Sequence, residues 1–548
     1  MTLKVICKFQ LRFLLFLFLL LFTSSYSLAQ RYKFTKADSL RGHLNIFRSC
    51  FDVTYYDLFV QVDIDKKSIT GSNYIQMLAT RDFNRIQLDL FSNMEIDSII
   101  YDRKSLPYER EANAFYVQFP DTIQADQLLG IYVYYHGSPL VAKRPPWDGG
   151  FVWAKDSLGR DWVGVSCEGI GASLWWPNKD HLSDRPDSMK ISMEIPDYLE
   201  GISNGRLLDT ISLANGNKIW TWKVSYPINN YNVSLNIAHY SYFNDQFQGL
   251  EGPLELNYWV LDYNLDKAKK QFRQVPPMLL CYEHYFGPYP FMRDGYKLVE
   301  TSYWGMEHQS CIAYGNNYED NDFGFDYIII HESAHEYWGN SVSAKDHGEV
   351  WIHEGFATYM ESLFMEFYHG REAAEDYMEL QKESIENQNP ILGPLEVNYI
   401  NWKDADMYYK GSWMLHSIRN TINNDSEWFA LLKNMYQEFK YTTVTSKDII
   451  GYLNARTEYN LEPIFNDFLE NDKAPLLKVV KRRNKAGIVL KYKWKDVLKD
   501  FNMPVEIRCG QENYRLFPTP KKQILILPDH NDEAIAFSTE LFYFYVKE

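Results

Sequence analysis

The sequence predicts a multidomain α+β protein, with an N-terminal antiparallel β domain, a helical domain and a small C-terminal β domain. Residues 51–237 are short β-rich segments separated by turn signals, and the pattern then changes to helical periodicity. Short strands return after residue 475. With 548 residues, 46% of them hydrophobic, the chain is long enough for several cores. We expect domains at 30–247, 248–475 and 476–548.

The N-terminus has the pattern of an export signal. Basic residues precede an apolar run at 13–22, and the small residues Ser27 and Ala29 stand just ahead of Gln30. We therefore expect a signal peptide at 1–29 and an exported protein, periplasmic or secreted. The apolar run is too short to span a bilayer comfortably, so we expect no stable membrane insertion after signal cleavage. An uncleaved anchor is the alternative.

Charge and cysteine usage exclude other classes of protein. The net charge is −16 without a long run of one sign, which argues against nucleic acid as the main partner. Five cysteines follow the signal, far apart and without paired spacing. This pattern predicts neither a disulfide framework nor a cysteine zinc site, although one or two bridges stay open.

Within the first domain, segments such as "YYDLFVQVDI" and "GIYVYYHG" alternate in polarity or are rich in β-formers. In the second, "LDKAKKQFRQVPPMLLCYEHYFG" has helical periodicity that the Pro pair resets. Two more helices are expected to end at Gly339 and Gly370, and Thr445 with Asp448 fits a capping box. "GIVLKYKW" and "KQILILP" predict the strands of the last domain.

The segment "HESAHEYWGN", residues 331–340, carries the first chemical motif. Positions i and i+4 share one helix face, so His331 and His335 can direct two ring nitrogens at one point. Glu332 lies roughly 100° further round and can reach only the rim of that point. This H-E-x-x-H pattern is typical of zinc metalloproteases. A pair of histidines satisfied within the core is the alternative.

A third ligand follows in "WIHEGFATY", where Glu354 stands near the start of the next helix. His331, His335 and Glu354 then form a site for one Zn²⁺ per chain with an open fourth position. Gly355 permits close helix approach, and His353 is expected to be a bystander. In this hypothesis Glu332 takes a proton from the zinc-bound water and later delivers it to the leaving amine.

Further segments extend the pattern, namely "WGMEHQ", "YYKG" and "WWPNKDHLSDRPDS". With the two histidine motifs, they resemble the zinc aminopeptidase family that includes aminopeptidase N and leukotriene hydrolase. The resemblance implies a gluzincin with a thermolysin-like catalytic domain, a small C-terminal β sandwich, and peptide substrates with a free N-terminus. We expect no counterpart of the long helical C-terminal domain common in that family, and therefore a more open cleft.

The resemblance also assigns substrate-binding residues. Glu307 would hold the substrate ammonium at one end of the groove, and Gly305 and Met306 belong to the same edge strand. Glu168 matches a second amine-binding position in the first domain. An ordinary loop carboxylate is the alternative for Glu168.

Tyr408 matches the tyrosine that stabilises the tetrahedral oxyanion, with Tyr409 as its rival. His308 stands where the family usually has Asn, and we expect its protonation to weaken activity on the acid side. The sequence thus predicts an exported zinc aminopeptidase. A gluzincin endopeptidase and an inactive peptide-binding homologue are the alternatives.

Overall fold

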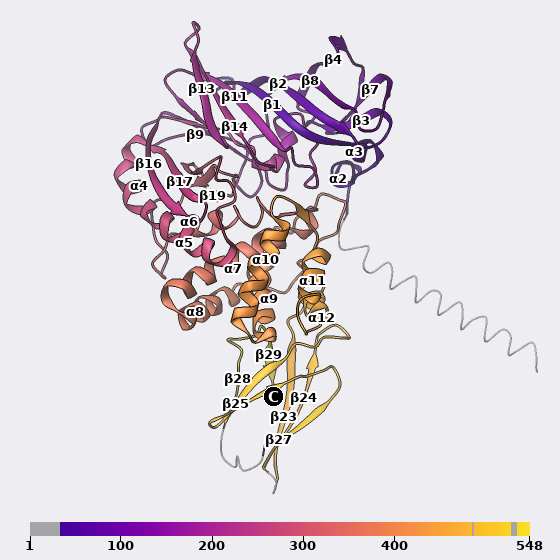
Figure 1. Cartoon of the computed structure of the whole chain (residues 1–548), viewed down its shortest axis with the longest axis vertical. Helices are drawn as coiled ribbons and strands as arrows, with labels where there is room; N and C mark the ends of the chain where they lie inside the picture. The colour runs from indigo at the N-terminus through magenta and orange to yellow at the C-terminus, as the bar shows by residue number, and fades with distance from the viewer. Residues whose placement is uncertain (1–32, 485–486, 528–533) are drawn as a thin grey trace, which may run out of the picture.

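The computed structural model describes residues 33–484, 487–527 and 534–548. The predicted signal peptide lies outside these residues. In the described part of the chain, no helix is long and apolar enough to cross a membrane. The molecule is elongated, with a β-rich domain at one end, helices in the middle and a small β domain at the other end (Figure 1).

The N-terminal domain is built on sheets that share one buried core. The largest has the order β13 (Arg206–Ser212), β14 (Asn217–Val224), β11 (Ser188–Pro196), β1 (Phe51–Asp63), β2 (Ser68–Ala79), β8 (Leu128–Gly137), β4 (Met94–Tyr101), β5 (Lys104–Ser105). Two smaller sheets are β3 (Phe83–Asp89), β7 (Ala114–Ile123), β6 (Tyr108–Glu111), and β12 (Glu200–Ile202), β15 (Asn236–Ala238), β10 (Asp161–Ser166), β9 (Gly150–Lys155). The large sheet is mixed, because the long connection from β1 to β11 lets these two strands pair in parallel.

The middle region begins with a five-stranded sheet of order β16 (Tyr240–Gly249), β17 (Gly252–Leu261), β18 (Tyr296–Glu300), β20 (Ile312–Tyr314), β19 (Gly305–Met306). The β16–β17 hairpin of this sheet begins at Tyr240, ahead of the domain boundary expected at residue 248. The helices are α4 (Leu265–Gln271), α5 (Val275–Phe286), α6 (Tyr327–Ala334), α7 (Trp351–His369), α8 (Arg371–Lys382), α9 (Asp406–Ile422), α10 (Asp425–Phe439), α11 (Ser446–Asn454), α12 (Glu462–Glu470). Thr445 and Asp448 form the predicted capping box.

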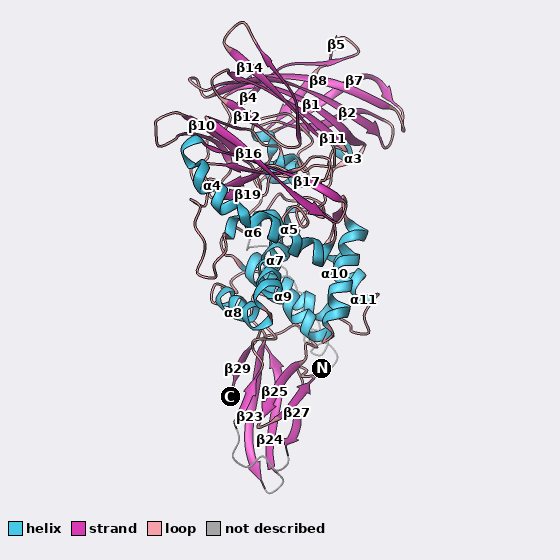
Figure 2. Cartoon of the chain, turned by 60° about the vertical axis from the view of Figure 1, so that its left-hand side comes forward, coloured by secondary structure: helices cyan, strands magenta, loops and turns pink. Residues whose placement is uncertain are grey.

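The C-terminal domain stacks two sheets into a small sandwich (Figure 2). One has the order β27 (Gln523–Leu527), β24 (Gly487–Lys495), β23 (Leu476–Asn484), β29 (Tyr545–Lys547), and the other β26 (Glu512–Leu516), β25 (Val505–Cys509), β28 (Ile535–Phe537). Buried side chains of this domain and of the helices belong to one continuous cluster. The three-part architecture predicted from the sequence is confirmed. All five cysteines in the described part of the chain are buried.

Candidate metal centre and substrate cavity

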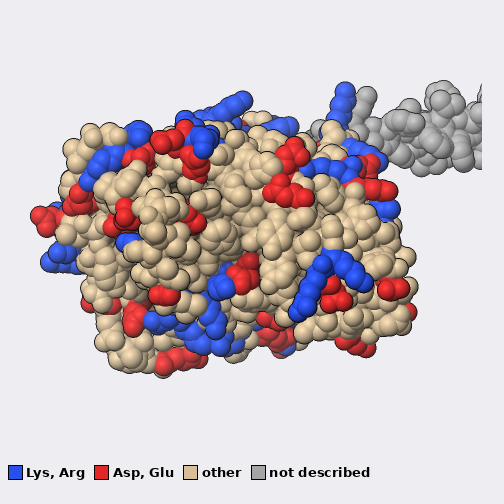
Figure 3. Space-filling view, turned by 90° about the horizontal axis from the view of Figure 1, so that it is seen from above, with Lys and Arg blue, Asp and Glu red and all other residues tan. Residues whose placement is uncertain are grey.

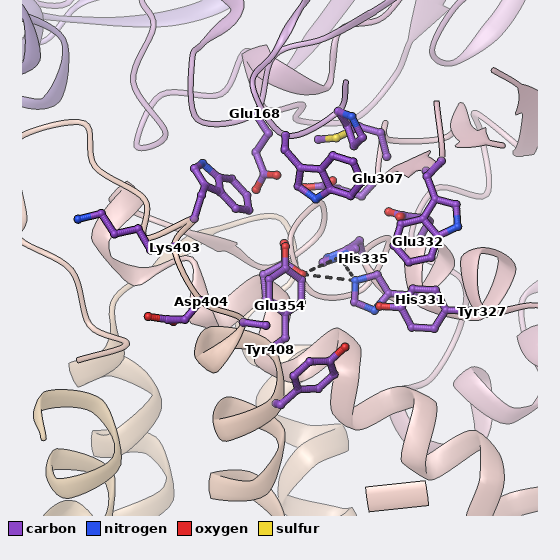
Figure 4. Close-up of a pocket in the computed structure, with 18 of the residues that line it drawn as sticks. Glu168, Glu307, Tyr327, His331, Glu332, His335, Glu354, Lys403, Asp404 and Tyr408 are labelled. Atoms are coloured by element: carbon purple, nitrogen blue, oxygen red, sulfur yellow. Dashed lines mark hydrogen bonds and ion pairs between the residues drawn. The ribbon is translucent and has the colours of Figure 1, made fainter. Parts of the chain in front are cut away.

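Three predicted ligands meet at one point. The Nε2 atoms of His331 and His335 lie 3.3 Å apart, and each lies 3.4 Å from Oε2 of Glu354. That carboxylate oxygen is buried and has no hydrogen-bond partner among the described residues. Figure 4 shows Glu354 reaching from one side toward both imidazoles.

These separations fit a tetrahedral ion. Bonds of about 2.0–2.1 Å at tetrahedral angles place neighbouring donor atoms about 3.3–3.4 Å apart. Two imidazole nitrogens and one carboxylate oxygen are also donors that zinc accepts in catalytic sites. The donor set and its spacing therefore fit Zn²⁺.

Neighbouring acceptors orient both histidines. Nδ1 of His331 lies 2.6 Å from Oε1 of Glu361, and Nδ1 of His335 lies 3.0 Å from the carbonyl oxygen of Trp338. Each Nδ1–H donates to its acceptor, which leaves the Nε2 lone pairs free for a metal. Glu361 is itself held by the hydroxyl of Tyr377. The sequence analysis missed Glu361, although it lies two helical turns after Glu354 on the same face of α7.

Local backbone structure brings these side chains together. α6 ends at Ala334, before the predicted end at Gly339, but His335 keeps helical angles as the C-cap (φ −62°, ψ −21°). The i, i+4 relation therefore survives. α7 ends at the predicted Gly370. Gly355 contacts Gly411 of α9, where an added Cβ would lie 3.2 Å from the Cα of Gly411, so the close approach joins α7 to α9.

A cavity of about 430 Å³ opens over the metal centre. Besides the three ligands, its lining includes every other residue that the sequence analysis placed at the site: Glu168, Gly305, Met306, Glu307, Glu332 and Tyr408. The cavity lies between the N-terminal domain, which supplies Glu168, and the helices (Figure 4). The cavity is therefore lined by residues from β19, α6, α7, α9 and the loop that follows β10.

Glu332 stands beside the ligands without joining them. A Cβ at position 305 would lie 2.5 Å from Oε1 of Glu332, so only glycine leaves room for this carboxylate. Burial, with the carboxylates of Glu307 and Glu354, raises the pKa of Glu332 to about 7, against the lowering effect of the two histidines. Such a pKa suits a group that accepts and returns a proton near neutral pH.

Two buried carboxylates occupy the other end of the cavity. In the part of the chain that the structure describes, Oε1 of Glu168 is buried and has no hydrogen-bond partner. Glu168 and Glu307 offer oxygens within 4.8 Å of a ring nitrogen of His353 and of each other. Burial and the charge of Glu307 raise the pKa of Glu168 well above its usual range. An ammonium group placed between these carboxylates would relieve both the burial and the repulsion.

A hydrogen-bond relay holds Glu307. The hydroxyl of Tyr231 donates to Oε1 of Glu307 at 3.0 Å. Ala344 N–H donates to Nε2 of His353, so the ring proton of this neutral histidine is on Nδ1, 3.5 Å from the Tyr231 oxygen. His353 lies outside the group of His331, His335 and Glu354, and its ring approaches Tyr231 behind the proposed amine anchor. The sequence offered no signal for Tyr231, which comes from a loop of the N-terminal domain.

The two candidate tyrosines sit in the first turn of α9. The rings of Tyr408 and His331 lie 6.0 Å apart, and the hydroxyl of Tyr408 points toward the metal centre (Figure 4). Burial raises the pKa of Tyr408, so its hydroxyl remains a donor. Tyr409 also lines the cavity but contributes to a second, adjoining cavity as well. Tyr327 stacks on His331.

His308 does not behave as expected. It is fully buried, and it does not line the cavity. Burial lowers its pKa to about 3, so the imidazole stays neutral at ordinary pH. The predicted acid-side competition with the substrate ammonium is therefore wrong, because burial makes the charged form costly.

Comparisons with known proteins agree with this geometry. Residues 272–468 match the sequence model of the peptidase family M1 domain. The chain contains an M1 peptidase domain. The fold is similar to that of an M1 zinc metallopeptidase from Deinococcus radiodurans, with a TM-score of 0.68 and 18% identity over 77% of this chain and 95% of that one.

Curated relatives of the M1 domain are aminopeptidases. The chain is 21% identical to a probable aminopeptidase 2 of Sulfurisphaera tokodaii, over 79% of this chain and 55% of the relative. It is 25% identical to mouse aminopeptidase B, over 47% of this chain and 41% of that protein. It is 22% identical to mouse endoplasmic reticulum aminopeptidase 1, over 48% of this chain and 30% of that protein. The chain thus spans about a third to a half of the length of these relatives.

Proposed function

We propose that this chain is an exported zinc aminopeptidase that removes the N-terminal residue from peptides. One observation carries the proposal: the two buried carboxylates Glu168 and Glu307 share a cavity with the three metal ligands, and Oε1 of Glu168 has no hydrogen-bond partner among the described residues. Any zinc protease needs the metal ligands. An anchor for the free ammonium group of the substrate, placed beside these ligands, directs cleavage to the first peptide bond. The relatives named aminopeptidases support the same reaction.

Each side chain has a role in this reaction. Glu168 and Glu307 bind the substrate ammonium by charge-assisted hydrogen bonds. A bound zinc ion would polarise the scissile carbonyl and lower the pKa of the attacking water. Glu332 accepts the proton of that water and delivers it to the leaving amine. Tyr408 donates its hydroxyl to the oxygen that gains negative charge in the transition state.

Matched substrates test the proposal. The wild-type enzyme should cleave a peptide with a free N-terminus at least about tenfold faster, in kcat/KM, than its N-acetylated counterpart. Comparable cleavage of both peptides would favour an endopeptidase. No turnover at a full zinc content would instead favour an inactive binding protein.

Export is tested separately. The sequence pattern at 1–29 supports it, and cell fractionation with N-terminal sequencing of the recovered protein is the direct measurement. Recovery outside the cytoplasm with a start at Gln30 is the expected result. An intact N-terminus in the cytoplasmic fraction would contradict the export part alone.

A further inference from the structure

The C-terminal sheet carries an unusual charge pattern. Strands β23, β24, β27 and β29 contain eight Lys or Arg residues and no Asp or Glu. The whole chain, in contrast, has a net charge of −16. The M1 match ends at residue 468, so this sheet lies outside the family model.

Strand register divides these residues between two faces. Leu477 and Val479 of β23 are buried with Leu490 of β24 in the core, so the alternate residues point outward. We call the outward side the basic sheet face. Its cations are Lys478, Arg482, Lys491, Lys493, Lys495 and Lys547. Its apolar residues are Leu476, Val480, Val489, Ile524, Ile526 and Tyr545.

Three lysines form a row across three strands. Lys478 is paired directly with Lys493 of β24 and with Lys547 of β29. Like charges opposite one another on neighbouring strands are destabilising. Within the part of the chain that the structure describes, none of the six cations of this face forms an ion pair. An anionic partner would relieve this repulsion.

Apolar side chains lie among the cations. Ile524 is 59% exposed, Ile526 52%, Tyr545 47% and Val480 39%. Ile524 is paired with Lys491, and Ile526 with Val489. Interspersed lysines and aliphatic groups suit an anionic lipid surface, where the apolar groups enter the headgroup boundary and the lysine stems extend to phosphates. A soluble polyanion would use the cations alone.

The face is also free of the catalytic machinery. Helices separate the C-terminal sandwich from the N-terminal domain (Figure 2). The opposite end of the molecule shows Lys and Arg interspersed with Asp and Glu, without such segregation (Figure 3). We infer that the basic sheet face docks the enzyme on the surface of a membrane rich in anionic lipid, independently of its peptidase activity.

Vesicle co-sedimentation of the full chain tests this inference. Wild-type protein should bind vesicles with about 30% phosphatidylglycerol at least tenfold more tightly than pure phosphatidylcholine vesicles. The triple variant Lys478→Glu, Lys491→Glu and Lys493→Glu should lose at least tenfold of that binding. Its peptidase activity and circular dichroism should be unchanged. If the triple variant misfolds, Lys491→Gln with Lys493→Gln gives the same test with a smaller expected loss of about threefold.

A matched control reverses three exposed lysines elsewhere, Lys104→Glu, Lys270→Glu and Lys447→Glu. It has the same net charge as the triple variant and should bind like wild type within about twofold. Equal loss in both variants would show a general charge effect and overturn the inference.

A second variant separates lipid from other anions. Ile524→Ser with Ile526→Ser should weaken vesicle binding about threefold or more and leave binding to heparin unchanged. Vesicle binding that is insensitive to this change, with heparin binding lost in the triple lysine variant, would show a polyanion site instead. Absence of vesicle binding by wild type would also overturn the membrane inference and leave an acidic protein as the partner to test.

Discussion

The catalytic cavity and the basic sheet face both gather side chains of one charge, but their surroundings differ. In the cavity, Glu168 and Glu307 are buried, and burial raises the pKa of both. On the sheet face, lysines stand in water, where repulsion is weak and screened by salt. A buried pair of like charges, such as Glu168 and Glu307, therefore selects one small cation in one position. An exposed cluster attracts an extended anionic surface without fixing the position of any single group.

The largest effect is expected from the proton acceptor in the cavity. Glu332→Gln should retain zinc and lower kcat by at least about 10³-fold, because the amide keeps the shape but accepts no proton from water. Steady-state kinetics with metal analysis of the same sample is the measurement. Near wild-type turnover would remove Glu332 from the mechanism.

A ligand variant is its control. Glu354→Ala should lose zinc itself, since two histidines alone make a weak site. The two variants therefore distinguish loss of metal from loss of proton transfer.

Tyr408→Phe should lower kcat about 10²–10³-fold while KM changes little, because the oxygen that it contacts is charged mainly in the transition state. Tyr409→Phe, the neighbouring change on the same helix, should be mild. The reverse result would transfer the role to Tyr409.

The amine anchor should give the next largest effect. Glu307→Ala should lower kcat/KM at least about tenfold on free-amine peptides, because the ammonium loses a buried charged partner. It should change the slow cleavage of N-acetylated peptides little, and zinc should stay bound. An equal loss on both substrates would indicate damage to the cavity instead of loss of the anchor.

Tyr231→Phe tests how the anchor is held. Removal of the hydroxyl leaves Oε1 of Glu307 without its donor, and we expect KM for free-amine peptides to rise about three- to tenfold with a smaller change in kcat. Tyr282→Phe is the matched control, because it also removes a buried hydroxyl, one that donates to the carbonyl of Ile330 in α6. Equal effects of the two changes would make Tyr231 a merely structural residue.

The salt dependence of binding should differ between the basic sheet face and the cavity, and salt should affect binding in the cavity least. Between about 0.05 and 0.5 M salt the Debye length falls to roughly 4 Å, so vesicle binding by the basic sheet face should weaken at least about tenfold. Under the proposed function, free amino acids would bind in the buried cavity through their ammonium group, and their inhibition should change less than about twofold. Equal salt sensitivity of both would erase the proposed distinction.

Much of the metal centre was predictable, because its signals are local. His331 and His335 are separated by one helical turn, and Glu354 follows at the start of the next helix. The residues that support the ligands and the amine anchor could not be predicted from the sequence. Glu361 orients His331 from α7, and Tyr231 reaches Glu307 from another domain. Residues so far apart in the sequence form no short spacing motif that would predict their contact.

Sequence alone predicted the three-domain order, three metal ligands and a candidate proton acceptor, since these follow from periodicity and motif spacing. Tertiary structure decided which groups share one cavity. It buried His308 and thereby kept it neutral, and it placed His353 behind the amine anchor. It also aligned lysines of three strands in one row. Burial and strand register depend on which distant segments pack together, and these properties set the charge state and the partners of each side chain.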